Sequence, residues 1–76
     1  MSNTILTPSE IARTERAKKL TMIRECQGLT VHQLAEKVGY TAGMISHLET
    51  ARNSGSIDLW AKIAKALDVP VDEFIC

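Results

Sequence analysis

The sequence predicts an all-α domain, a compact bundle of five short helices. Three observations predict this class: apolar residues recur at helical spacing, residues typical of helix ends bound each such segment, and no segment shows convincing strand alternation. The chain has 76 residues and is 45% hydrophobic, with one residue each of Trp, Tyr and Phe. So short a chain forms one domain with a thin core, which we expect to span residues 7–76.

The first helix is predicted from residue 8 to about residue 26 or 27, after an N-terminal arm (residues 1–6) that we expect to be flexible. The run Thr7-Pro8-Ser9-Glu10 is typical of a helix start, with threonine at the cap and proline at the first helical position. Gly28 is the predicted stop. The apolar positions along this helix are Ile11, Leu20 and Ile23.

Residues 30–49 predict two further short helices joined by a single glycine. Thr30 can cap the first of them, about 31–38, and Gln33 completes a capping-box spacing. Gly39 ends that helix because glycine tolerates the left-handed geometry of a helix end. A second helix held across the first after such a tight turn is the helix-turn-helix arrangement of DNA-binding proteins.

The second helix of this pair is predicted at about 42–50, with Thr41 as its cap and Ile45 and Leu48 on its inner face. The loop Asn53-Ser54-Gly55 follows, and Ser56 can cap a fourth helix. That helix ends before Pro70, since the residue before a proline disfavours helical geometry. A final turn is expected at 72–75, anchored by Phe74. The expected buried stripe of the fourth helix consists of Ile57, Trp60, Ile63, Ala64 and Leu67.

Five segments in register resemble the phage-repressor/Cro-type (XRE) helix-turn-helix family, from about Leu20 to Ile75. They are Ile23-Arg24, Gly28-Leu29-Thr30, Leu34-Ala35-Glu36-Lys37-Val38-Gly39, Ile45-Ser46 with Leu48-Glu49, and Ile63-Ala64-Lys65-Ala66-Leu67. The resemblance implies a lambda-repressor-like five-helix fold whose members bind operator DNA as dimers, with the 42–50 helix reading the DNA. It also implies a structural ion pair between Arg24 and Glu49, which would fix the angle between the first helix and the reading helix.

The resemblance and the helical periodicity together give the candidate DNA contacts. Base edges in the major groove would meet the outward residues of the reading helix. These base-contacting candidates are Ala42, Gly43, Met44, Ser46 and His47. The phosphate-contacting candidates are Thr30, Val31, His32, Thr41, Arg52 and Asn53.

Two features depart from the family pattern. Relatives commonly carry Arg, Gln or Asn where this chain has Ala42 and Gly43, so we expect direct base reading to be sparse and DNA shape to matter more. Relatives often have glutamine where this chain has Val31. Valine can contact phosphate only through the backbone N–H groups at the start of its helix.

The formal net charge of the chain is +0, whereas DNA-binding domains usually carry a basic excess. Basic residues crowd between Arg13 and Arg24, and the C-terminal residues are acidic, so a basic face remains possible. The simpler interpretation of the Arg13–Lys19 charge run is a solvated helix face with no part in binding. Operator binding by a repressor-like transcriptional regulator is the leading prediction. A protein-interaction or antitoxin/antirepressor-type module on the same fold is the alternative.

A homodimer on double-stranded DNA is the expected assembly, because one helix in one groove gives little specificity. A small apolar interface would involve Leu59, Val69, Val71, Ile75 and Cys76; alternatively these residues close the monomer core. We expect no enzyme activity, cofactor, metal site, small-molecule substrate or membrane span, since no pattern for any of them is present. Cys26 and Cys76 are far apart, which favours a reducing cytoplasm over a disulfide framework.

Overall fold

The computed structural model describes residues 8–75, in which all regular structure is helical. The predicted all-α class is therefore confirmed, whereas the predicted arm at 1–6 and the cap at Thr7 lie outside the described residues. No helix in the described part of the chain is long and apolar enough to cross a bilayer. The helices are α1 (Pro8–Cys26), α2 (Val31–Val38), α3 (Ala42–Glu49), α4 (Ile57–Leu67) and α5 (Asp72–Ile75).

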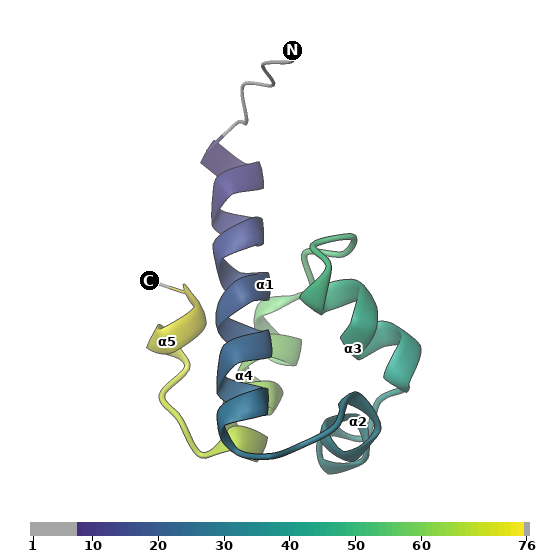
Figure 1. Ribbon diagram of the computed structural model, residues 1–76. Helices are drawn as coiled ribbons and strands as arrows, with labels where there is room; N and C mark the ends of the chain where they lie inside the picture. Colours follow the sequence, from purple (N-terminus) through teal and green to yellow (C-terminus); the bar gives the residue numbers. More distant parts are fainter. Residues whose placement is uncertain (1–7, 76) are drawn as a thin grey trace.

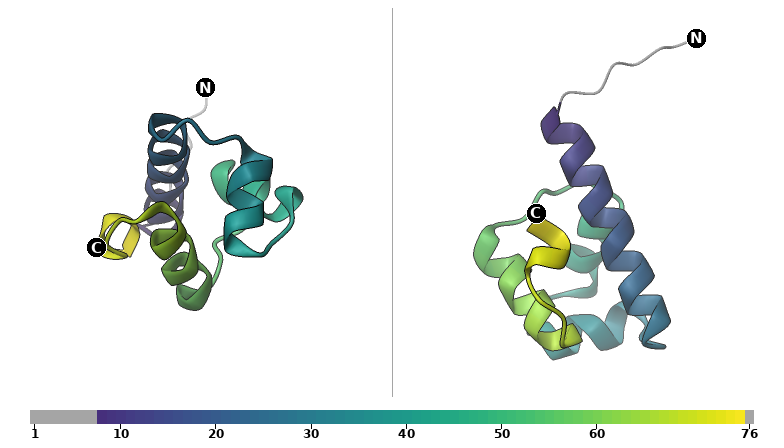
Figure 2. Two further views of the ribbon diagram at one scale, coloured as in Figure 1. Left: turned by 90° about the horizontal axis from the view of Figure 1, so that it is seen from below. Right: turned by 90° about the vertical axis from the view of Figure 1, so that its left-hand side faces the viewer.

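The long helix α1 organises the bundle. Figure 1 shows the α2–α3 pair on one side of α1 and α5 on the other, with α4 behind. The C-terminal ends of α1 and α4 are joined by a hydrogen bond in which Gln27 Nε2 donates to the carbonyl oxygen of Leu67 at 2.6 Å. The N-terminal half of α1 extends beyond the other helices, as the right-hand view of Figure 2 also shows. Ile11 in that half is consequently exposed.

The core contains buried side chains from all five helices. The Trp60 and Phe74 rings pack with their centroids 5.1 Å apart, and the indole N–H of Trp60 donates to the carbonyl oxygen of Ser54 at 2.8 Å. Since a buried indole N–H needs an acceptor, this bond lets the tryptophan lie in the core. The largest fully buried side chains are those of Leu20, Leu34, Ile45, Leu48, Ile63 and Leu67.

Two predictions for α4 are wrong. Ile57, placed on the buried stripe, is 72% exposed, whereas Leu59, proposed for an intermolecular interface, is only 4% exposed. Ile57 is the first residue of α4, and it is exposed although helical spacing aligns it with the stripe. Leu59 packs in the monomer core, and Val69 and Val71 pack partly buried against that core. The alternative for these three residues, closure of the core, is therefore confirmed.

Candidate nucleic-acid interface

The start of α2 has the expected capping box. The backbone N–H of Gln33 donates to Thr30 Oγ1 at 3.0 Å, and the backbone N–H of Thr30 donates to Gln33 Oε1 at 2.8 Å. The first N–H groups of a helix have no acceptor within the helix. The box occupies those of Thr30 and Gln33, so the N–H groups of Val31 and His32 are left at the positive end of the α2 dipole.

The turn between α2 and α3 is short because each helix end is closed locally. Gly39 has φ +86° and donates its N–H to the carbonyl oxygen of Ala35 at 2.8 Å, which ends α2 in left-handed geometry. Two residues later Thr41 caps α3, its hydroxyl accepting from the N–H of Met44 at 3.1 Å. The angle between the two helices is thus set by a short turn in which both helix ends are hydrogen-bonded.

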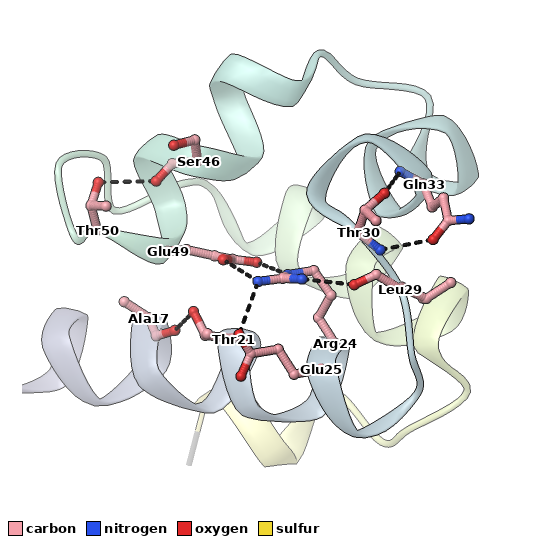
Figure 3. A network of polar contacts seen from close by, with 10 residues as sticks. All are labelled: Ala17, Thr21, Arg24, Glu25, Leu29, Thr30, Gln33, Ser46, Glu49 and Thr50. Carbon is pink, nitrogen blue, oxygen red and sulfur yellow. Dashed lines mark hydrogen bonds and ion pairs between the residues drawn. The ribbon is translucent and has the colours of Figure 1, made fainter.

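An ion pair ties α3 to α1. Figure 3 shows Arg24 reaching from α1 to Glu49 at the end of α3. Its Nε donates to Glu49 Oε2 at 2.6 Å and its Nη2 donates to Oε1 at 3.1 Å, while Nη1 donates to the carbonyl oxygen of Leu29 at 2.7 Å. The hydrogen bond to Glu49 raises the pKa of Arg24 above its ordinary value, against the opposing effect of burial. One guanidinium therefore positions both α3 and the segment that enters α2.

The outward face of α3 consists of Gly43, Ser46 and His47, which are exposed. Ala42 and Met44, also placed on the outward face from the sequence, are instead half-buried and pack against the core. They lie at the edge of the stripe formed by Ile45 and Leu48. Met44 is also contacted by the loop after α3, because Asn53 Nδ2 lies 3.7 Å from its Sδ. Helical spacing alone does not reveal this contact.

The candidate phosphate contacts lie on two sides of α3. Thr30, Val31, His32 and Thr41 are at the two helix starts, where Val31 is half-buried and packs against the core. Arg52 and Asn53 are in the loop after α3. The Arg52 side chain is exposed. The Asn53 amide is already engaged, because its Oδ1 accepts from the N–H of Gly55 at 2.9 Å and its Nδ2 contacts Met44 Sδ at 3.7 Å.

The loop after α3 is rigid for reasons that the sequence did not reveal. Ala51 adopts φ +62°, and the N–H of Arg52 donates to the carbonyl oxygen of His47 at 2.8 Å, closing the helix end. Gly55, at φ +69°, lies against Trp60, where a Cβ would be 2.8 Å from the indole nitrogen. The Asn-Ser-Gly composition indicated a loop but gave no signal for these contacts.

A tight two-helix corner, a capped second helix with an exposed face, and an ion pair holding that helix define a helix-turn-helix domain. The family model for the helix-turn-helix proteins HTH_3 matches residues 20–74. The chain belongs to this family, as its resemblance to the XRE-type proteins predicts. No curated protein sequence matches it closely.

Solved structures of bacterial regulators have the same fold. The clp gene regulator ClgR from C. glutamicum is 30% identical with a TM-score of 0.79, over 84% of this chain and 83% of that one. An HTH_3 family transcriptional regulator from Vibrio cholerae has a TM-score of 0.83 at 24% identity, over 88% of this chain. The present chain spans only 38% of that regulator. The hypothetical transcription factor NHTF from Neisseria has a TM-score of 0.83 at 21% identity, over 100% of this chain and 87% of that one.

Proposed function

We propose that this protein is a DNA-binding transcriptional regulator that places α3 in the major groove of double-stranded DNA. The observation that carries the proposal is the exposed face of α3, with Gly43, Ser46 and His47, held at a fixed angle by the Arg24–Glu49 pair. Membership of the helix-turn-helix family and the likeness to a clp gene regulator support it.

In this arrangement the contacts divide into two kinds. Ser46 and His47 offer hydrogen bonds to base edges, while Gly43 lets the α3 backbone approach the groove closely. The backbone N–H groups of Val31 and His32 and the side chain of Arg52 hold phosphates on the two sides of the groove. Since few side chains can read bases, DNA shape supplies much of the selectivity.

We further propose that the protein acts as a homodimer and as a repressor. A helix of eight residues covers one half-site, and two-fold symmetry places a second α3 about one helical turn away. A regulator that binds DNA through such a domain represses most simply by occupying the operator. Because Leu59 is in the monomer core, the dimer contact must use other surface.

Enrichment of bound duplexes from a random library, at low and moderate salt, tests the proposal. A two-fold symmetric consensus is expected, with sedimentation or mass photometry giving a dimer on the selected duplex. The matched control is Ser46→Ala/His47→Ala, which removes the polar side chains of the exposed α3 face while leaving the Arg24–Glu49 pair in place. A consensus without symmetry would contradict the dimer alone, whereas no enrichment at either salt would contradict DNA reading.

A protein-interaction or antitoxin/antirepressor-type module is the second candidate. The zero net charge, the lack of polar side chains at Ala42 and Gly43, and the apolar Val31 favour it. Binding to random-sequence DNA separates the two, because neutralised phosphates make DNA affinity steeply dependent on salt. Absence of binding at low salt would move the interaction module to first place.

A further inference from the structure

An open pocket lies between the projecting half of α1 and the loop that follows α3. Its volume is about 430 Å³, within the range of roughly 300–1,000 Å³ typical of ligand sites. It is lined by Ala12, Arg13, Arg16 and Ser54. Two arginines and a hydroxyl therefore meet around it, and no carboxylate is among these lining residues.

Arg16 is not part of a simple solvated face. Its guanidinium carbon lies 5.9 Å from the centroid of the Trp60 ring, within the distance of a cation–π interaction. Its Nε is buried and has no hydrogen-bond partner among the described residues. Since a buried donor without an acceptor is costly, the arginine is poised to accept a ligand that brings one.

The chemistry of the lining selects an oxyanion. A guanidinium presents its N–H groups in a fork that matches phosphate or carboxylate oxygens, and a serine hydroxyl adds a further donor. A second arginine, Arg13, is half-buried at the same pocket.

The position of the pocket indicates where the oxyanion comes from. Ser54 is two residues beyond Arg52, a candidate phosphate contact in the same loop, and it lines the pocket together with residues of α1. Each DNA strand carries a phosphate every 3.4 Å or so of helix axis. Successive phosphates leaving the major groove would thus meet Arg52 first and the pocket next.

We propose that this pocket is a phosphate-binding site for the DNA backbone outside the half-site read by α3. The inference rests on the proposed DNA-binding function and extends it to α1. Arg13 and Arg16 bind a phosphodiester, and the Trp60 ring packs against the Arg16 guanidinium. A net charge of zero is then compatible with DNA binding, because two of the basic residues of α1 are placed together at one phosphate-binding pocket.

Trp60 is the chain's single tryptophan, so its fluorescence reports on the pocket directly. Inorganic phosphate is added in exchange for chloride, so that the ionic strength stays constant. The fluorescence is expected to change with phosphate concentration and to reach a plateau. Arg13→Gln should raise the phosphate concentration at half-saturation by about tenfold, the usual effect of losing a charged hydrogen bond. Lys18→Gln, an exposed charge on the same helix, should leave it unchanged. No response in the wild type, or equal losses in both variants, would overturn the site.

A second arm identifies the source of the phosphate. Affinity for a random-sequence duplex is measured against salt for the wild type, for Arg13→Gln/Arg16→Gln and for Lys18→Gln/Lys19→Gln. The arginine variant should flatten the log–log slope by about 0.9 per lost contact, near 2 in total, and the lysine variant should not. Thermal melting checks that Arg16→Gln remains folded, and Arg13→Gln alone must still flatten the slope by about 0.9.

The outcomes separate this inference from the proposed function. A phosphate-dependent fluorescence change with an unaltered DNA slope would overturn the DNA assignment and leave a site for a free phosphate. Equal slope losses in the arginine and lysine variants would mean general attraction rather than a pocket. Failure of the wild type to bind any duplex would contradict the proposed function itself, and the DNA assignment with it.

Discussion

The Arg24 guanidinium and the Glu49 carboxylate form a bidentate ion pair whose two bonds measure 2.6 and 3.1 Å. Both side chains are mostly buried, with 11% and 9% of their surfaces exposed. A third bond, from Arg24 to the carbonyl oxygen of Leu29, fixes the entry to α2. The orientation of the reading helix therefore depends on a single side chain in α1.

Replacing Glu49 by alanine should lower stability and DNA affinity together. The variant leaves the Arg24 charge buried without its partner, which costs about 3–5 kcal/mol and lowers the melting temperature by more than about 10 °C in a domain of this size. Glu25→Ala is the matched control, because Glu25 approaches Arg24 only to 3.7 Å and is largely exposed. Thermal denaturation followed by circular dichroism measures both; an unchanged melting point for Glu49→Ala would contradict the structural role of the pair.

Gly55 is expected to be intolerant of any side chain. An alanine Cβ there would lie 2.8 Å from Trp60 Nε1 and 3.1 Å from Leu48 Cδ2, at φ +69°. Left-handed strain and overpacking together should cost about 2–4 kcal/mol. Gly28→Ala isolates the strain alone, since Gly28 has φ +71° with nothing within 4 Å of its Cβ position. Urea denaturation that finds the two variants equally stable would exclude the contact with Trp60.

Ala51→Gly should stabilise the protein. Ala51 closes α3 with φ +62°, a conformation that glycine adopts without the cost of a Cβ. The expected gain is about 0.5–1 kcal/mol in the free energy of unfolding. Ala61→Gly makes the same change at an exposed position inside α4, where it should instead cost about 0.5–1 kcal/mol. Effects of the same sign in the two variants would count against the left-handed closure of α3.

Substitutions of His47 and Arg52 should affect DNA binding in different ways. His47→Ala removes a candidate base contact, so preference at one base pair should fall by about 1–3 kcal/mol without a change in salt dependence. Arg52→Gln removes a candidate phosphate contact, so binding should weaken uniformly across sequences and the salt slope should flatten by about 0.9. Competition binding on the selected duplex and its point variants measures both. A His47→Ala variant with unaltered base preferences would remove His47 from the reading surface.

The sequence by itself determined both ends of α2 and the start of α3, because these are settled by bonds between residues close together in the chain. The Thr30–Gln33 capping box and the left-handed Gly39 require no knowledge of the rest of the fold. The same is true of Thr41, whose hydroxyl bonds a backbone group three residues on. These short-range bonds place the α2–α3 corner, and with it the exposed residues Ser46 and His47.

Tertiary structure alone decided which apolar and charged side chains of a helix meet a neighbour. Ile57, expected in the buried stripe of α4, is exposed, and Leu59, expected at an intermolecular interface, is in the monomer core. Met44 packs half-buried against the core and contacts Asn53 of the loop after α3, and the guanidinium of Arg16 in α1 lies over the Trp60 ring of α4. Helical spacing gives the direction of a side chain from its own axis, whereas burial depends on where the other axes begin, end and cross.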